Sequence, residues 1–402
     1  MDAWALTDHG NGNGLAHAHS AAVKLQKKGV KYRQLYGVEF YFVSSLSQWR
    51  EDYETHKQEV KDAKEKKRSK KSDEDDVEQG GHVVEDESET KAEQTSEKPE
   101  WQRRYHLVAV AKNYEGLANV NRLVKASFKD GFYRYPRIDF DMIEKWGKGI
   151  VWSSGCIGGY LARIVSKGEK LGKSRAQILS DLEEACGEFQ TRVDPDSFFL
   201  ELQFNKLDFQ HLVNGYLIDL SKKTGIKLVS TCDSHYPSPD KWEARELYKK
   251  LGWMGDKLDK GALPKFEDLK CELYPKNAVQ MWDEYKKGLE SHQEVYEGSE
   301  ELVRDSIERT HDIAWQMCED TWVDTSPKLP HFGKPGNSAM KQLVSLLKKK
   351  MSEQGFDNDQ RYVDRLKEEL TVVKAKKFED YFLTLHAIFQ KASARAMIGP
   401  AR

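Results

Sequence analysis

ALTDHGNGNG, residues 5–14, precedes a helical pattern and then YGVEFYFV, residues 36–43, and this succession sets the architecture of the first part of the chain. The apolar run before the glycines predicts a strand, and the glycines predict a flexible turn. Gly29 lies where the following helix should end. We therefore predict a strand, a helix and a second strand over Trp4–Thr7, Leu15–Lys28 and Val38–Val43.

Similar apolar runs recur farther along the chain: YHLVAVA (105–111), GIVWSSGC (149–156), FFLELQF (198–204) and IKLVSTCDSHY (226–236). Helical patterns lie between them, at Arg175–Thr191 and Leu207–Thr224. Short β-rich runs that alternate with helices favour an α/β fold, with βα units around a parallel sheet or barrel. Past about residue 238 the strand pattern stops and helical patterns follow, for example at 341–355 and 360–377. A domain boundary is expected near 240–280, giving domains of about 1–240 and 241–402.

The stretch from about residue 51 to 100 differs in composition, because Lys, Glu, Asp and Ser dominate it. It has too few apolar residues to offset the entropy of ordering. We predict an insertion that is disordered or a frayed charged helix, with a nucleic-acid-binding tail as the less favoured alternative.

The bulk composition narrows the class of protein. The 402 residues carry a formal net charge of −2, which argues against a free-standing nucleic-acid-binding module. The five cysteines are scattered and form no CxxC pair, as in a reduced cytosolic protein. The first residues do not resemble a signal peptide, and no apolar run is long enough to span a membrane. A cytoplasmic location and no membrane partner are expected.

The predicted strands end in residues that can bind metal ions. The first ends in Asp8-His9 and the second carries Glu39, while His106 opens the third run. Later runs end in Cys156 and in Asp233-Ser234-His235. In a βα barrel the strand ends converge on one face, so these imidazole, carboxylate and thiol groups should meet there. Each residue alone has an ordinary structural interpretation, and the prediction of a metal site depends on their conjunction.

Two other patterns are weaker. His17 and His19 form an HxH pair, but they fall inside the predicted first helix, where residues two apart point to different faces. The glycines at 10–14 lack the Lys and hydroxyl residue of a phosphate-binding loop. We interpret the histidines as surface or helix-packing residues and the glycines as a turn.

Together these motifs resemble the polymerase-and-histidinol-phosphatase (PHP) domain, in the version found in the alpha subunits of bacterial DNA polymerase III. The resemblance is carried by ALTDHGNGNG, YGVEFYFV, the segment 105–139, GIVWSSGCIGG (149–159), FLELQ (199–203) and LVSTCDSHY (228–236). The segments YVDRLKEELTVV (362–373), EDYFL (379–383) and IGPAR (398–402) resemble the helical thumb and early palm of the same polymerases.

The resemblance implies a distorted (β/α) barrel with a cluster of divalent metal ions, Zn²⁺ or Mn²⁺. The positions that match its ligands are His9, Glu39, His106, Cys156, Asp233 and His235. Asp8 would support these ligands from behind or join them. Metal-bearing members could act as 3′→5′ exonucleases through a metal-held hydroxide.

Two departures from the family pattern give further expectations. The family begins with an earlier strand that bears an HxH motif, so the barrel is expected to be incomplete at its N-terminus, with an unpaired edge. At the other end Ala401 replaces a usual glycine, and Arg402 matches a residue that contacts the nucleotide triphosphate. The palm aspartates that hold Mg²⁺ are not present, so this chain is expected not to polymerise DNA by itself.

Three hypotheses follow. The chain is a segment of a replicative DNA polymerase (a nucleotidyltransferase when complete), a metal-dependent phosphoesterase or exonuclease, or a non-catalytic scaffold for the polymerase. The first implies DNA, deoxynucleoside triphosphates, the remaining polymerase segment, a sliding clamp and other replisome subunits as partners.

Overall fold

The computed structural model describes residues 2–69, 102–257, 272–320, 323 and 330–393. The chain divides into two units, residues 1–322 and residues 323–402.

The first unit is built on a curled mixed sheet that forms a half-barrel. The order is β4-β5-β2-β3-β6-β7-β8, and β1 pairs in parallel with the first half of β2. The strand β3 is antiparallel to both β2 and β6, whereas β6, β7 and β8 are parallel. The strands are β1 (Ala3–Leu6), β2 (Arg33–Phe42), β3 (Tyr105–Ala111), β4 (Phe132–Tyr133), β5 (Tyr135–Ile138), β6 (Ile150–Ser153), β7 (Phe198–Leu202) and β8 (Leu228–Ser230).

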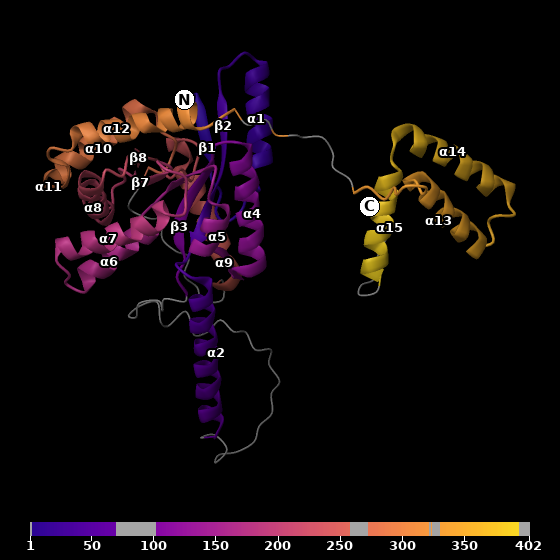
Figure 1. Cartoon of the computed structure of the whole chain (residues 1–402), viewed down its shortest axis with the longest axis horizontal. Helices are drawn as coiled ribbons and strands as arrows, with labels where there is room; N and C mark the ends of the chain where they lie inside the picture. Colours follow the sequence, from indigo (N-terminus) through magenta and orange to yellow (C-terminus); the bar gives the residue numbers. More distant parts are fainter. Residues whose placement is uncertain (1, 70–101, 258–271, 321–322, 324–329, 394–402) are drawn as a thin grey trace. The chain divides into compact units, whose positions relative to one another are not determined.

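Helices connect and cover these strands, as Figure 1 shows. Local signals fix their starts: Asn113 caps α4 by accepting from the Gly116 amide, and Ser174 and Gln177 form a capping box on α7. The helices of this unit are α1 (Leu15–Lys27), α2 (Leu46–Ser69), α4 (Tyr114–Asp130), α5 (Phe140–Trp146), α6 (Tyr160–Lys170), α7 (Arg175–Gln190), α8 (Asp208–Thr224), α9 (Trp242–Lys257), α10 (Ala278–Ser291), α11 (Gln293–Tyr296) and α12 (Glu300–Asp312). The predicted α/β class is confirmed.

Alternation along the strands separates two faces of the sheet. One face packs under the helices and forms the main core, which includes Phe40, Leu107, Trp152 and Leu200. The other face lines the inside of the curl, where one end is apolar and packs against the π-helical turn η4 (Ile313–Met317). The apolar residues there are Leu35, Val110, Val151, Phe199 and Val229. Residues of the same parity nearer the other end are polar, and they include Glu39, Ser153 and Glu201.

The first unit extends past the predicted boundary near 240–280, because α12 packs on β8 and η4 packs inside the curl. The charged stretch begins as a helix: α2 is anchored by buried Leu46 and Trp49 and then continues away from the body (Figure 1). Residues 70–100 of that stretch lie outside the described residues.

The strands β1 and β8 each pair with a single neighbour among the described strands: β1 is hydrogen-bonded to β2, and β8 is hydrogen-bonded to β7.

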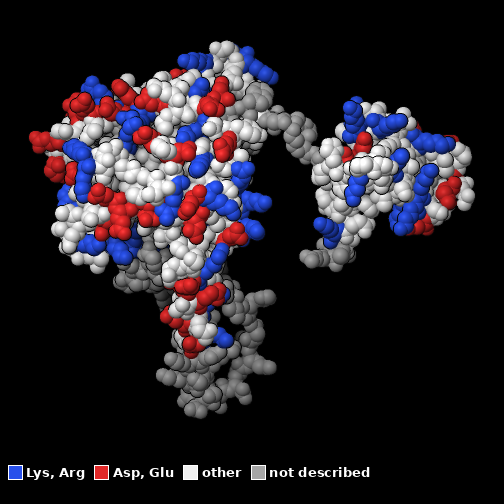
Figure 2. Space-filling model, viewed as in Figure 1, with Lys and Arg blue, Asp and Glu red and all other residues white. Residues whose placement is uncertain are grey.

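The second unit contains α13 (Ala339–Glu353), α14 (Gln360–Lys376) and α15 (Glu379–Ser393), held by a small core around Leu343 and Leu383. No described helix is long and apolar enough to cross a membrane. On the face of the first unit shown in Figure 2, acidic and basic side chains are interspersed, which agrees with the near-neutral composition.

The buried His211 of α8 should make the stability of the first unit depend on pH. Its Nδ1 lies 2.7 Å from the Tyr296 hydroxyl, and its ring stacks on His292 with 4.1 Å between centroids. Burial, followed by the charge of His292, lowers the pKa of His211 to about 4. Because an unfolded histidine titrates near 6.5, the unfolded state binds the proton first as the pH falls. The free energy of unfolding should therefore drop by about 3 kcal/mol between pH 6.5 and 4.

Urea denaturation at a series of pH values checks this effect. The His211→Gln variant should lose less stability than the parent between pH 6.5 and 4.5, where most carboxylates are still ionised. Exposed His17 offers a control, since His17→Gln should keep the parent's pH dependence. Equal slopes for His211→Gln and the parent would contradict the prediction.

Candidate metal centre

Three predicted ligands form a tight group at the polar end of the inner sheet face. His9 follows β1 and lies beside Glu39 of β2, because the Glu39 amide donates to the Asp8 carbonyl (3.1 Å) and the Gly10 amide donates to the Glu39 carbonyl (2.8 Å). Glu39 Oε1 lies 2.6 Å from His106 Nδ1 and 3.6 Å from His9 Nδ1. Ligand atoms of His9, Glu39 and His106 all lie within 4.8 Å of one another.

The loop after β6 brings Cys156 to this group. Gly155 has a φ of +74°, and a Cβ there would lie 2.8 Å from the His106 carbonyl oxygen, so the tight approach requires glycine. The His106 amide donates to the Gly158 carbonyl at 3.0 Å. Cys156 Sγ consequently lies 3.3 Å from His106 Nδ1.

Asp233 and His235 form the remaining part of the site after β8. Asp233 Oδ1 lies 3.3 Å from His235 Nε2, and the rings of His235 and His9 are 6.2 Å apart. Asp233 has a φ of +44°, a left-handed conformation that costs energy in a non-glycine residue. Such strain persists where the surrounding structure imposes it, and it occurs often at functional sites.

The surroundings favour an ionised Asp233, and burial keeps Cys156 a thiol. Burial opposes ionisation of Asp233 most strongly, but its hydrogen bond with His235 and the nearby imidazoles lower its pKa overall. That hydrogen bond, with burial opposing it, raises the pKa of His235. Burial and then the charges of Asp233 and Glu39 raise the pKa of Cys156. A bound cation would reverse this effect on the thiol.

These residues fit a divalent metal ion. Imidazole nitrogens and a carboxylate oxygen are ligands that zinc and manganese accept. His9 Nδ1 is buried and has no hydrogen-bond partner among the described residues, and it faces Glu39. A buried nitrogen without a partner is costly unless another group satisfies it, and a metal ion would do so. Burial lowers the pKa of His9, which keeps its imidazole neutral and able to coordinate.

A cavity of about 590 Å³ extends from this group along the inner face of the sheet. His9, Glu39, Cys156, Asp233 and His235 line its polar end. Apolar residues of the inner face, such as Val151 and Phe199, line the remainder. The predicted convergence of strand-end residues is therefore present in the geometry.

Glu201 of β7 belongs to the same cavity, although it was not among the predicted site residues. It is 3% exposed, and its carboxyl group accepts from Ser153 of β6, Thr231 after β8 (2.6 Å) and Gln203 (2.8 Å). Burial raises the pKa of Glu201 in spite of these hydrogen bonds. Glu201 thus joins the segments that lead to Cys156 and Asp233.

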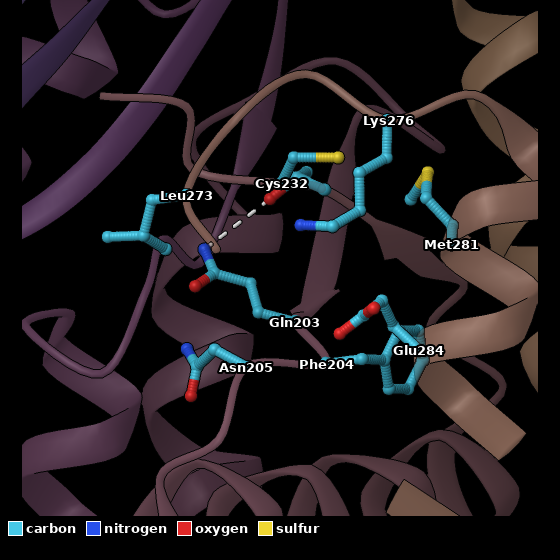
Figure 3. A pocket seen from close by; sticks show the side chains of 9 residues that line it. Gln203, Phe204, Asn205, Cys232, Leu273, Lys276, Met281 and Glu284 are labelled. Atoms are coloured by element: carbon cyan, nitrogen blue, oxygen red, sulfur yellow. Dashed lines mark hydrogen bonds between the residues drawn. The ribbon is translucent and has the colours of Figure 1, made fainter. Parts of the chain in front are cut away.

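Gln203, which donates to Glu201, lies beside a small pocket that is shown in Figure 3. Gln203 also donates to Thr231 (3.4 Å), and the pocket is lined on other sides by Cys232, Lys276 and Glu284. Hydrogen-bond partners behind metal ligands commonly change metal affinity by about 10- to 100-fold when removed. The hydrogen-bond partners of Glu201 are not ligands themselves, but Ser153 and Thr231 lie three and two residues before Cys156 and Asp233, so Glu201 can act on these two ligands through the backbone.

Replacing Glu201 by Leu should weaken metal binding by about tenfold or more, because Thr231 and Ser153 lose their common acceptor. Glu201→Gln keeps an acceptor and the side-chain shape, so it should retain most of the affinity. Titration of the metal-free protein with Zn²⁺ and Mn²⁺ by calorimetry measures both variants. Parent-like affinity in Glu201→Leu would show that Glu201 has no influence on the ligands.

The other predicted residues have separate places. Asp8 Oδ2 accepts from the Gly14 amide at 2.9 Å, so this carboxylate braces the turn that carries His9. His17 is exposed on α1, and His19 is buried with Nδ1 2.7 Å from the Tyr36 hydroxyl, so the two side chains take a surface position and a helix-packing position. Arg402, the predicted nucleotide contact, lies outside the described residues.

The curled α/β sheet carries an imidazole–carboxylate group of the kind that could hold a metal ion. The PHP domain family matches residues 1–205, half of the chain, and the chain belongs to this family. The family described as bacterial DNA polymerase III alpha NTPase domain matches residues 339–402.

Similar proteins are named DNA polymerase III subunit alpha. The protein from Aquifex aeolicus is 26% identical over 74% of this chain and 24% of its own length. Those from Borreliella burgdorferi and Helicobacter pylori are 28% and 25% identical, over 69% and 75% of this chain. The chain spans about a quarter of the length of these relatives, with 22% and 25% for the latter two.

Proposed function

We propose that this chain is the PHP-bearing segment of a replicative DNA polymerase of the DNA polymerase III alpha type. We further propose that its PHP domain holds a divalent metal ion, zinc or manganese, between His9, Glu39 and His106. The observation that carries this proposal is the placement of these ligand atoms within 4.8 Å of one another, with His9 Nδ1 buried and without a hydrogen-bond partner among the described residues. Asp233, His235 and Cys156 would complete the site from the neighbouring strand ends.

In this proposal the metal ion ties together the ends of β1, β2 and β3, and the domain acts mainly as a scaffold for the polymerase. In the complete polymerase the substrates would be DNA and deoxynucleoside triphosphates, with Mg²⁺ at the separate palm site. A sliding clamp and other replisome subunits would be its partners.

A 3′→5′ exonuclease is the second candidate, because the metal group is open to solvent. The side chains of His9 and His106 are 38% and 24% exposed, so a phosphodiester could reach them. A bound divalent ion would supply an acidified water and polarise a phosphoryl oxygen. The protein's own contribution would be to orient that phosphodiester at the rim of the site.

Elemental analysis of the purified chain, followed by titration of the metal-free protein with Zn²⁺ and Mn²⁺, tests the metal site. Near-stoichiometric binding is the expected result, and no binding of either ion would overturn it. An assay with end-labelled single-stranded DNA then separates the two roles. Bound metal without hydrolysis supports the scaffold, whereas hydrolysis that Glu39→Gln removes supports the exonuclease. For the polymerase assignment, the flanking coding sequence should contain an acidic palm motif downstream, and its absence would contradict the assignment.

A further inference from the structure

An aromatic side chain extends outward from the metal group. Tyr41 lies two residues after Glu39 on β2 and therefore faces the same side of the sheet. Its ring is parallel to the His9 imidazole, with an interplanar angle of 1° and 5.7 Å between centroids. The His106 ring is 5.8 Å away from Tyr41. The Tyr41 ring therefore lies next to the imidazole rings of two proposed ligands, His9 and His106.

Tyr135 and Arg104 continue this cluster toward solvent. The Tyr135 ring meets Tyr41 edge-on at 5.2 Å, and 36% of Tyr135 is exposed. The Arg104 guanidinium lies 3.7 Å from the Tyr135 ring centroid and 5.3 Å from that of Tyr41. Arg104 precedes His106 by two residues, so one short segment supplies both a proposed ligand and this cation. Arg104 Nε is buried and has no hydrogen-bond partner among the described residues.

These groups suit a nucleobase next to a phosphodiester. Aromatic rings and arginine guanidinium planes stack on bases without regard to sequence, and each stacked base contributes substantially to binding of single strands. Arginine can also bind a phosphate oxygen, because its planar donors match that group. A strand end with its terminal phosphodiester at His9 and His106 would bring the adjoining base to Tyr135 and Arg104.

We propose that Tyr135 and Arg104, supported by Tyr41, form a binding site for the 3′-terminal base of single-stranded DNA whose phosphodiester lies at the metal group. This site rests on the proposed metal-dependent function and specifies its ligand as a strand end with an intact base. Tyr135 makes the stacking contact, and Arg104 holds its ring and the neighbouring phosphate.

Fluorescence anisotropy with a labelled single-stranded oligothymidine tests the site against the same strand with an abasic 3′ residue. The metal-loaded chain should bind the intact strand at least about fivefold more tightly, since loss of a stacked base costs at least this factor. Tyr135→Leu should remove the preference, and Tyr135→Phe should retain it. Tyr248→Leu, at a 78% exposed tyrosine of α9, is the matched control and should bind as the parent does.

The metal content of each variant is measured in parallel, so the two proposals fail separately. If the parent binds intact and abasic strands equally, or if Tyr135→Leu keeps the preference, the stacking site is wrong even with metal bound. If no metal binds, the proposed metal centre is wrong, and the comparison of strands is made on the metal-free chain. If the metal-free chain prefers the intact strand and Tyr135→Leu abolishes this preference, the stacking site is still supported. A strand with an abasic 5′ residue should bind like the intact strand, and a loss only in this arm would contradict the assignment to the 3′ end.

Discussion

Glu39→Gln should reduce the affinity of the chain for Zn²⁺ and Mn²⁺ by at least about 100-fold, since loss of a hydrogen-bond partner behind a ligand can already cost that much. Glu39 is the only carboxylate of the tight group in the described structure, and it lies between His9 and His106. Glutamine has the same shape but removes the negative charge that balances the cation. The fold should therefore persist while the metal ion is lost.

Thermal unfolding with and without added metal separates these effects. A ligand that binds only the native state raises its stability, so Zn²⁺ or Mn²⁺ should raise the Tm of the parent and leave that of Glu39→Gln unchanged. In EDTA the two proteins should unfold at similar temperatures. Glu284→Gln is a matched control, because Glu284 is also buried but pairs with Lys287 away from the group. A parent-like metal response in Glu39→Gln would contradict the assigned ligand set.

The beginning of the fold was predictable because its signals are local. A short apolar run, a glycine-rich turn and a stop at Gly29 predicted the first helix to within one residue of α1. The strand β2 begins at Arg33, five residues before its predicted start at Val38. Gln34 and Leu35 are neighbours on opposite faces of this strand, and both are buried. The segment therefore lacks the alternation of exposed and buried residues that would have marked it as a strand. The strand that each helix packs against could not be predicted from local sequence signals, and the packing of α12 on β8 is an example.

The ligands could be predicted because their chemistry is specific and they occur at strand ends, whose convergence follows from topology. Glu201 was missed because it lies inside a strand, within FLELQ. Its parity was the available signal: Glu201 is two residues from Phe199, whose side chain faces the interior of the curl. Sequence alone does not show which strand neighbours place Ser153 and Thr231 around that carboxyl group. The exposure of Tyr135 and its contact with Arg104 likewise depend on tertiary structure.

Gly116→Ala should destabilise the first unit strongly, although alanine is normally the better helix former. A Cβ on Gly116 of α4 would lie 1.7 Å from the carbonyl oxygen of Gly149, which is backbone and cannot rotate away. That oxygen accepts from the Lys112 amide at 2.9 Å, so moving it would disturb the junction of β3 and β6. Forced overpacking costs about 1–3 kcal/mol and sometimes more. Because the clash is with backbone, the cost should lie at the top of this range, and after the helix-propensity gain of about 1 kcal/mol is subtracted a net loss of about 2 kcal/mol is expected.

Gly187→Ala in α7 provides the opposite test, because a Cβ at Gly187 would meet no heavy atom within 4 Å. The same substitution should there raise the free energy of unfolding by up to about 1 kcal/mol through helix propensity alone. Urea denaturation of both variants in EDTA measures the two changes without any contribution from metal. Opposite signs would show that the close approach of α4 to Gly149 holds the beginning of β6 in place, and with it the strand that leads to Cys156. A neutral or stabilising Gly116→Ala would mean that α4 can move away without cost, so this contact would not position the metal-binding loop.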